Sequence, residues 1–377
     1  MQIQIQRAYF TEQLNDVLKA ISNRTTLPIL SGIKIEVSSD KLVLIGSNGE
    51  ISIEITIPTE VDNEEILTVT EPGEAVLPAR FFTDIIKKLD GDYVQLKSTD
   101  QFGIQVSGGK SNFVISGSNP DQYPLLPEVN NEESIKIAAS VLKTIINETN
   151  FAVSSSETRP VLTGVNWQFF DDSLHFTATD SHRLALRKLN DKENSIEISN
   201  AIIPGKALHE LNKIIEDSEE DVEINFSQNQ VLFKYGHLRF ISRLLEGNYP
   251  DTSRLFPENF ETKLVINNNE FLKAIDRVSL LALEGGNSAI KMTIDNSRVL
   301  LSSNSPEIGN VEEEVGALNL EGEPLQISFN SRYMMDALRA IPEEEVSIEF
   351  FGTMKPFTIQ SSTSNDVVQL ILPIRTY

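Results

Sequence analysis

The run TDSHR contains the residues of this sequence whose types are most suggestive of catalysis: Asp180, Ser181 and His182. A carboxylate, a hydroxyl and an imidazole are the groups of a serine-hydrolase triad, so the run raises the possibility of acyl transfer or hydrolysis. Adjacent residues of a strand or turn point in different directions, however, and the members of a triad normally meet through the fold. No G-x-S-x-G nucleophile elbow accompanies them. A hydrolase that uses His182 with Asp180 is therefore only an alternative interpretation.

The segment Gly108-Gly109-Lys110-Ser111 resembles the end of a phosphate-binding P-loop. That motif requires another glycine six residues before the lysine, and Ile104 stands there instead. We expect a hairpin turn between two strands at this place.

Metal and thiol chemistry find little support in the composition. The chain has no cysteine, which excludes disulfides, thiol nucleophiles and cysteine zinc sites. None of its four histidines forms an HxxxH pair, so we expect no metal and no cofactor. The absence of cysteine fits a reducing cytoplasm. No apolar run approaches a membrane span and the first residues lack a secretory apolar region, so a membrane or exported protein is not expected.

One pattern occurs three times along the chain, each time as a short lead-in, a basic residue and a helical apolar stripe. The copies are LPARFFTDIIKKL (77–89), IPGKALHELNKII (203–215) and FNSRYMMDALRAI (329–341). Their basic residues, Arg80, Lys206 and Arg332, are spaced by 126 residues in both intervals. Equal spacing of one local pattern indicates an internal repeat.

Apolar residues alternate between two periods within each repeat. Spacings of three and four residues predict helices over 7–24, 80–89, 140–150, 204–215, 267–282 and 330–341, with Asn267 and Glu270 as a capping box. Strict alternation, as in Ile51–Ile57 and Val346–Phe350, predicts half-buried strands. Two helices on antiparallel sheet give an α+β unit. We expect three similar domains, over 1–129, 130–257 and 258–377, with proline-bearing connectors closing the first two.

The charge of the chain is strongly negative overall but unevenly distributed. With 32 Lys+Arg and 55 Asp+Glu the net charge is −23, which by itself argues against nucleic-acid and anionic-membrane partners. The six predicted helices, however, carry 13 basic and 8 acidic residues, a net of +5, and the rest of the chain carries a net of −28. A solvated helix face would explain one such helix. Because the bias recurs with the repeat, we favour helices gathered to face a polyanion.

The sequence also resembles the bacterial sliding clamp family, the DNA polymerase III beta subunit. The resemblance rests on the LPARFF and IPGKAL openings, on RTTLPIL (24–30), TATDSHRLA (177–185) and EGNYPDTSRLFP (246–257), and on the terminal LPIRTY (372–377). It spans the whole chain in order. It implies a non-enzymatic homodimer, joined head to tail, that closes into a ring with helices lining the hole.

The resemblance further implies partners. Such a ring encircles double-stranded DNA without reading its sequence and tethers the replicative DNA polymerase. Repair proteins would bind through short peptide motifs. Since no Walker motif is present to drive opening of a closed ring, an ATP-dependent clamp loader is also implied.

Three sets of site residues follow. By resemblance, a peptide pocket is lined by Leu162, Thr179, Ser181, His182, Arg183, Leu184, Pro250, Arg254, Leu255, Leu370, Leu372, Pro373, Ile374 and Arg375. Also by resemblance, the dimer seam joins Lys110, Phe113 and Ile115 to Leu280, Leu281, Glu307, Glu312, Glu313 and Glu314 of the other copy. For DNA contact we select Arg24, Arg80, Lys88, Lys143, Arg159, Lys206, Lys273, Arg277, Arg332 and Arg339.

A second function class stays open beside the clamp. An acidic repeat scaffold that binds only proteins would share the composition and the repeats, but it would not be retained on circular DNA.

Overall fold

The computed structural model describes residues 1–22, 25, 27–126, 129, 134–190, 199–256, 259–284, 288–295 and 298–375. Arg24 and the Gly285-Gly286 pair lie outside these residues. The chain forms two compact units: Met1–Leu142 with His209–Leu244, and Lys143–Leu208 with Leu245–Tyr377. Neighbouring strands of the described sheets pair antiparallel throughout.

The first unit contains two large sheets. A five-stranded sheet has the order β11 (Ser111–Ile115), β10 (Ile104–Gly108), β9 (Tyr93–Ser98), β1 (Gln2–Gln6) and β7 (Leu67–Glu71). An eight-stranded sheet has the order β12 (Ser134–Ala138), β17 (Asp221–Phe226), β18 (Gln230–Tyr235), β19 (Leu238–Arg243), β4 (Ile51–Pro58), β3 (Lys41–Ser47), β2 (Gly32–Val37) and β8 (Gly73–Pro78). A short ribbon pairs β5 (Glu60–Val61) with β6 (Glu64–Glu65).

The second unit also contains two main sheets. A nine-stranded sheet has the order β16 (Asn200–Pro204), β13 (Gly164–Phe170), β14 (Ser173–Thr179), β15 (Arg183–Asn190), β28 (Val367–Ile371), β27 (Phe357–Ser361), β26 (Glu345–Phe350), β20 (Thr262–Asn267) and β24 (Asn319–Gly322). A four-stranded sheet has the order β23 (Gly309–Val315), β22 (Val299–Ser305), β21 (Ala289–Ile294) and β25 (Leu325–Asn330).

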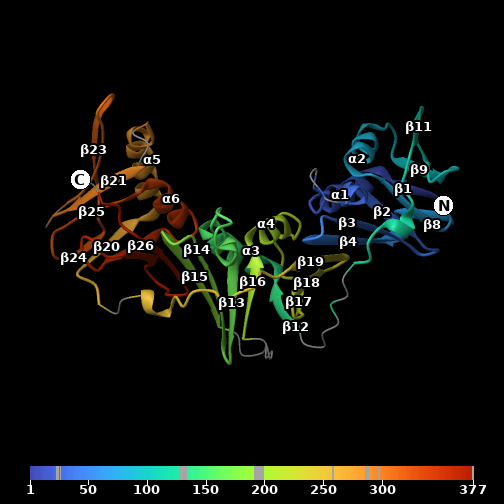
Figure 1. The fold of residues 1–377 in the computed structure, drawn as a ribbon. Coiled ribbons are helices and arrows are strands. Elements are labelled where there is room, and N and C mark those ends of the chain that lie inside the picture. Colours follow the sequence, from blue (N-terminus) through green and yellow to red (C-terminus); the bar gives the residue numbers. More distant parts are fainter. Residues whose placement is uncertain are drawn as a thin grey trace. The chain divides into compact units, whose positions relative to one another are not determined.

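Six α-helices are described, and each follows a strand directly, as Figure 1 shows. They are α1 (Arg7–Leu18), α2 (Ala79–Lys88), α3 (Ala139–Thr149), α4 (Gly205–Asn212), α5 (Asn268–Glu284) and α6 (Ser331–Arg339). Five short 3₁₀ helices lie in the connections: η1 (Pro28–Ser31), η2 (Pro120–Gln122), η3 (Asn150–Ala152), η4 (Pro160–Thr163) and η5 (Ser253–Leu255). The six predicted helices are thus present. The α+β class and three similar domains, each with two helices, agree with the sequence prediction.

The repeat pattern reappears as geometry. Arg80, Lys206 and Arg332 are each the second residue of a helix, α2, α4 and α6, and each is exposed. A small residue precedes each of them and starts the helix. At Gly205 the reason is close packing, because a Cβ there would lie 2.7 Å from the Asn150 side-chain oxygen.

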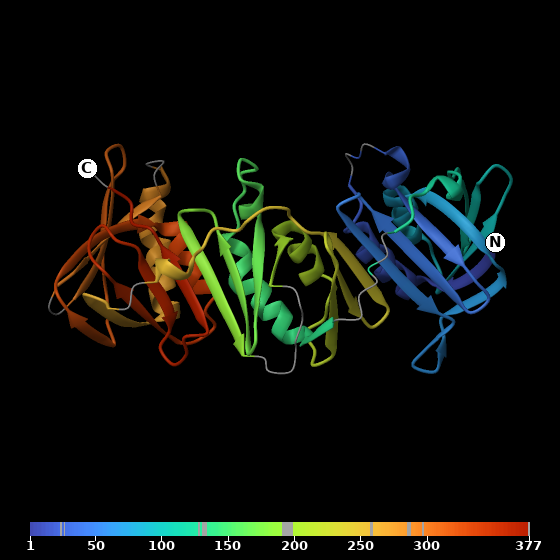
Figure 2. The same ribbon diagram turned by 60° about the horizontal axis from the view of Figure 1, so that its bottom comes forward.

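The apolar stripes of the helices face the sheets. In the first unit, Phe10 of α1 meets Phe82 of α2 edge to face, with ring centroids 6.0 Å apart, and both rings are fully buried. In the second unit, Phe271 of α5 and Met334 of α6 share one core with residues from the nine-stranded and four-stranded sheets. Figure 2 shows strands in front of these helices. Burying each such side chain stabilises the fold by about 1.5–3 kcal/mol.

Helices α1 and α4 end at least three residues earlier than the periodicity predicts. Helix α1 ends at Leu18. The backbone N–H groups that follow donate to carbonyls three residues earlier, as a 3₁₀ turn does; Ala20, for example, donates to Val17. Helix α4 ends at Asn212, and Ile214 likewise donates to Leu211. The apolar spacing continues through both turns, so the sequence pattern does not mark the helix ends.

The central repeat contributes strands to both units. Strand β19 pairs with β4 of the first repeat, and β15 pairs with β28 of the third. Each large sheet is therefore continuous across a repeat boundary. For this reason the compact units do not coincide with the three repeats.

Candidate functional site

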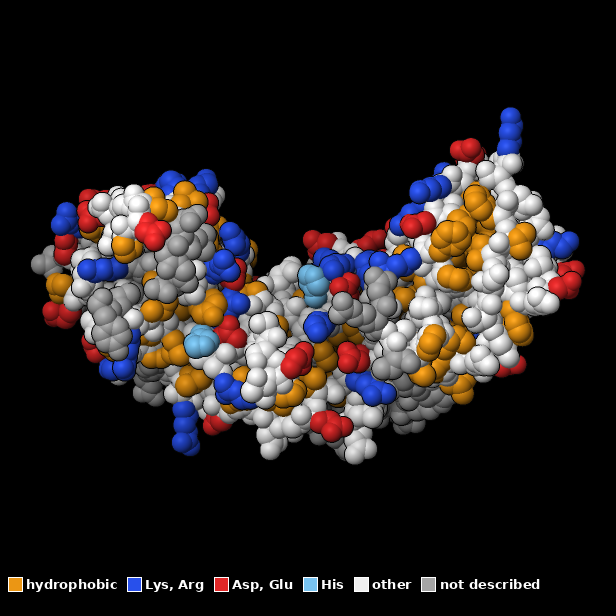
Figure 3. Space-filling model, turned by 45° about the horizontal axis from the view of Figure 1, so that its top comes forward, with side chains coloured by type: hydrophobic (Ala, Val, Ile, Leu, Met, Phe, Trp, Pro, Cys, Tyr) orange, Lys and Arg blue, Asp and Glu red, His pale blue; other side chains and the backbone are white. Residues whose placement is uncertain are grey.

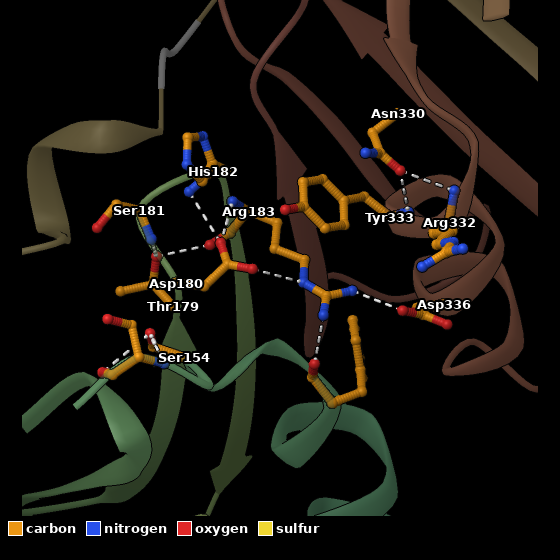
Figure 4. Close-up of polar contacts among 12 residues, drawn as sticks. Ser154, Thr179, Asp180, Ser181, His182, Arg183, Asn330, Arg332, Tyr333 and Asp336 are labelled. Atoms are coloured by element: carbon orange, nitrogen blue, oxygen red, sulfur yellow. Dashed lines mark hydrogen bonds and ion pairs between the residues drawn. The ribbon is translucent and has the colours of Figure 1, made fainter. Parts of the chain in front are cut away.

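The turn between β14 and β15 forms the centre of the predicted peptide pocket (Figure 4). The Asp180 Oδ1 atom accepts hydrogen bonds from the backbone N–H groups of His182 and Arg183, at 2.8 and 3.0 Å. The Thr179 hydroxyl donates to the Arg183 carbonyl at 2.6 Å and accepts from the Ser181 N–H at 3.1 Å. Ser181 has φ +78°, a left-handed conformation that costs a non-glycine residue energy.

These bonds bear on the hydrolase alternative. Asp180 Oδ1 serves the backbone of the turn, and Oδ2 accepts from the Arg183 Nε at 3.1 Å. Both carboxylate oxygens are therefore engaged away from the His182 imidazole. The imidazole instead stacks on the Tyr333 ring, with centroids 6.5 Å apart and planes 22° apart. A base oriented by a carboxylate, as a triad requires, is not formed here.

The Arg183 side chain is a hub of contacts. Its Nη1 lies 2.6 Å from Asp336 Oδ2, and its Nη2 donates to the Phe151 carbonyl at 2.7 Å. The guanidinium carbon also lies 4.5 Å from the Tyr333 ring centroid. Only 13% of the side chain is exposed. Arg183 therefore links the turn to α6, and its guanidinium is held in place as one wall of the predicted pocket.

Tyr333 and Asp336 belong to this site although the sequence analysis did not include them. Both lie on α6, whose first turn is capped by the Asn330 side chain through bonds to the N–H groups of Arg332 and Tyr333. Burial, followed by the nearby Asp180 carboxylate, raises the pKa of the Tyr333 phenol. A signal was present in the sequence, because an aromatic residue follows the repeated basic residue here, as Phe81 follows Arg80.

The apolar part of the predicted pocket is partly sealed and partly open. Leu184 and Leu370 are neighbours across β15 and β28, are almost fully buried and form a cluster against which Phe256 packs. Leu162 is buried as well. Leu255 and Leu372, in contrast, are 44% and 37% exposed. Exposed leucines beside a buried apolar cluster suit an apolar anchor from a ligand.

The C-terminal segment is held against the turn. The Leu372 N–H donates to the His182 carbonyl at 2.9 Å, and the Ile374 N–H donates to the Ser328 carbonyl at 2.7 Å. Pro373 and Ile374 are half-buried, whereas Pro250, Arg254 and Arg375 are exposed. The described structure thus brings the predicted pocket residues of 179–184 and of 370–375 together in the second unit.

A cluster of buried polar side chains joins α3 to β15 and β28. The Glu148 carboxylate of α3 is 3.5 Å from Arg187 of β15, and the Gln369 amide of β28 donates to the Glu148 carbonyl at 3.1 Å. Burial raises the pKa of Glu148 to about 7, against the lowering effect of Arg187 and with the help of Glu343 and Asp366.

Most of the residues selected for DNA contact lie on helices and have exposed side chains. Outside the undescribed Arg24, all are exposed except the half-buried Lys143. Several have partners: Arg277 pairs with Glu313, Lys206 lies 3.8 Å from Glu157, and Arg339 lies 3.7 Å from Asp336. The face in Figure 3 carries Lys and Arg in patches interrupted by Asp and Glu.

Arg159, also selected for DNA contact, lies outside the α-helices. It lies just before η4, and its Nη2 donates to the Ser181 hydroxyl at 3.0 Å. The side chain therefore borders the peptide pocket.

The predicted seam residues lie on two edge strands, in the turns before them and on α5. Strand β11 is one of the two edge strands of the five-stranded sheet, and β23 is one of the two edge strands of the four-stranded sheet. Phe113 is 41% and Leu280 is 66% exposed. Lys110, Glu307, Glu312 and Glu314 are exposed, and Leu281 and Glu313 are half-buried. Ile115 differs, because its side chain is buried within its own unit, while the neighbouring Val114 is 70% exposed. The Gly108–Ser111 segment is the predicted hairpin turn, with Gly109 at φ +57°.

Two negative findings concern the described residues alone. Among them, no group of three His, Asp or Glu side chains is placed to hold a metal ion. No helix within these ranges is both long and apolar enough to cross a bilayer.

Comparison with known proteins decides the family. Models of the N-terminal, central and C-terminal domains of the DNA polymerase III beta subunit match residues 1–127, 136–251 and 253–375. The beta sliding clamp of Staphylococcus epidermidis is 62% identical over 377 residues, covering 100% of both chains. The chain belongs to the bacterial sliding clamp family.

Further clamps agree along the full length. The beta sliding clamp of Staphylococcus aureus is 60% identical over all of both chains. The crystal structure of the sliding clamp from Bacillus subtilis has 47% identity and a TM-score of 0.97, and each chain covers 100% of the other. Family membership favours neither the hydrolase nor the protein-only scaffold.

Proposed function

We propose that this chain is a DNA sliding clamp, a processivity factor that performs no catalysis. Two copies would join head to tail into a ring around double-stranded DNA and tether the replicative DNA polymerase. The observation that carries the proposal is the full-length match, in order, of all three domains to sliding clamps. The domains would extend over 1–129, 130–257 and 258–377, and the protein would act in the cytoplasm.

Exposed basic residues on the helices support a DNA-facing side. Arg80, Lys206 and Arg332 occupy the same helical position in the three repeats. Weak contacts to phosphate suffice, because closure of the ring, rather than affinity, would prevent escape. A sliding ring also has no use for base readout, since contacts specific to bases would stop it.

The edge strands support the dimer. Unpaired edges such as β11 and β23 present free backbone donors and acceptors to another chain. Lys110 at one edge and the acidic run at the other would add complementary charge, with Phe113 and Leu280 as apolar contacts. Ile115 would contribute through the core that supports β11.

The pocket around Thr179–Arg183 supports tethering. Its partly exposed leucines would take apolar peptide anchors from the polymerase and from repair proteins, and Arg254 and Arg375 would hold polar groups. Tethering raises the polymerase's local concentration at the primer end. Because a closed ring does not thread onto circular DNA, an ATP-dependent clamp loader is needed.

The test is retention on DNA of different topology. Clamps loaded onto nicked circular DNA should stay bound at salt concentrations that remove ordinary binders, and they should leave when the circle is cut. Equal loss from circular and linear DNA would contradict the topological mechanism. No retention at all, even with a loader and ATP, would favour the acidic scaffold.

The pocket is tested separately. Replacing His182 with Ala should weaken the binding of a short peptide with leucine and phenylalanine anchors, measured by fluorescence anisotropy. A measurable hydrolytic turnover that disappears in the same variant would instead support the alternative of a hydrolase that uses His182.

A further inference from the structure

Asp336 of α6 lies between two arginines that belong to different surfaces. Its Oδ2 atom is 2.6 Å from Arg183 Nη1, and its Oδ1 atom is 3.7 Å from Arg339 Nη1. Arg183 is 13% exposed and lies in the wall of the peptide pocket (Figure 4), whereas Arg339 is 56% exposed and ends α6. One carboxylate therefore serves both side chains.

On the pocket side, Asp336 holds Arg183 in place. Arg183 also bonds to Asp180 and to the Phe151 carbonyl, but Asp336 provides its charged partner on α6. The same guanidinium lies over Tyr333, which stacks on His182. Since Arg183 is largely shielded from water, the loss of this partner would loosen the wall that a peptide contacts.

On the other side, Asp336 restrains Arg339. A carboxylate beside an exposed arginine offsets its charge and competes with phosphate for it. Asp336 is the acidic residue of α6, whose other charged side chains are Arg332 and Arg339. Removal of the carboxylate would leave this helix surface more attractive to DNA.

We propose that Asp336 is a positioning residue shared by the two surfaces: it orders the peptide pocket through Arg183 and weakens DNA contact through Arg339. The inference rests on the proposed function and concerns the regulation of its peptide site. Linkage between the two ligands would follow, because a change in either arginine alters the carboxylate available to the other.

The experiment uses the full chain and the variants Asp336→Asn and Asp336→Glu, with Asp276→Asn as a matched control. Asp276 is an exposed carboxylate on α5, so its replacement removes the same charge away from Arg183. The probes are the tightest binder from a panel of fluorescein-labelled peptides with leucine and phenylalanine anchors, and a short labelled DNA duplex at low salt. Urea denaturation monitors folding of each variant.

For Asp336→Asn we expect peptide affinity to fall about fivefold, since the ion pair is replaced by a weaker hydrogen bond from the guanidinium to an uncharged amide. DNA affinity should rise about twofold, since one opposing charge is removed. Asp336→Glu should return both affinities toward wild type. Asp276→Asn should leave peptide binding unchanged, whatever its effect on DNA.

Opposite changes distinguish this proposal from general damage. A fall in both affinities, unchanged peptide binding, or a peptide defect without a gain in DNA binding would each overturn it. Failure of the proposed function would look different, because the wild-type chain itself would then fail to bind at least one of the two probes.

Discussion

Ser181 occupies a backbone conformation that glycine adopts without cost. Its φ of +78° lies in the left-handed region, where a side chain costs about 1–2 kcal/mol. The surrounding turn holds it there through the Thr179 hydroxyl and the Asp180 carboxylate. Strain of this kind at a pocket rim is stabilised by neighbouring hydrogen bonds.

Replacing Ser181 with Gly should therefore raise the free energy of unfolding by up to about 1 kcal/mol. The change also removes the exposed hydrogen bond from Arg159, which offsets part of the gain. Urea denaturation measures the difference. Ser181→Ala, which keeps the Cβ and removes the hydroxyl, is the control and should show no gain; equal stabilisation by both variants would exclude backbone strain as the cause.

Glu148 should make stability depend on pH. Its pKa in the folded chain is raised to about 7, so the folded state binds its proton more tightly than the unfolded state. The contribution of Glu148 is thus most favourable at low pH and is lost as the pH rises from about 4.5, its ordinary value, to about 7.

The comparison with Glu148→Gln isolates this effect from the other carboxylates. The difference in unfolding free energy, wild type minus variant, should fall as the pH is raised through that window, as measured by urea denaturation at several pH values. A difference that stays constant would mean that the folded carboxyl titrates normally.

At the scale of elements, the cap of α6 supports the site. Asn330 closes β25 and accepts from two N–H groups of the first helical turn, at 2.9 and 3.3 Å. Replacing it with Ala should cost about 1 kcal/mol of stability, as typical N-cap substitutions do. Asn330→Asp preserves an acceptor and should be close to wild type in thermal denaturation. A full loss in both variants would show that capping is not the role of this side chain.

Helices and strands were predictable because their apolar spacing reports the buried face. Val346–Phe350 and Ile51–Ile57 lie in β26 and β4, and the Asn267 side chain does cap the Glu270 N–H at 3.0 Å. Helix ends were less predictable, because the apolar spacing around Ala20 continues after the helical bonds change.

From the motif alone the site was predictable only where its residues are close in sequence, and distant pocket residues such as Leu372 came from the family resemblance. Thr179–Arg183 forms one turn and could be identified from the motif. Tyr333 and Asp336 reach that turn from α6, and no local pattern records which helix packs against it. Ile115 was placed at the seam by resemblance, and its side chain is buried within its own unit at the end of β11, although Phe113 on the same face of the strand is exposed.

At the scale of the whole molecule, the proposed dimer seam includes Leu280. A leucine that is 66% exposed on α5 suits an apolar contact between copies. Replacing it with Arg should shift dimer to monomer, because an unpaired charge would be desolvated at the seam. Light scattering measures the mass. Leu125→Arg, which alters a leucine that is 93% exposed in the connector after the first repeat, should remain dimeric; a dimeric Leu280→Arg would contradict the seam assignment.

Continuity of the large sheets limits how this chain can be recombined with its relatives. The pairs β19–β4 and β15–β28 each join two repeats, so their facing side chains must be compatible. A chimera with exchange points between repeats would bring strands from different parents together in both sheets. These contacts are preserved when the exchange points lie inside the central repeat, so that β19 comes from the same parent as β4 and β15 from the same parent as β28. In such hybrids the unit that is inherited whole is a sheet and not a repeat.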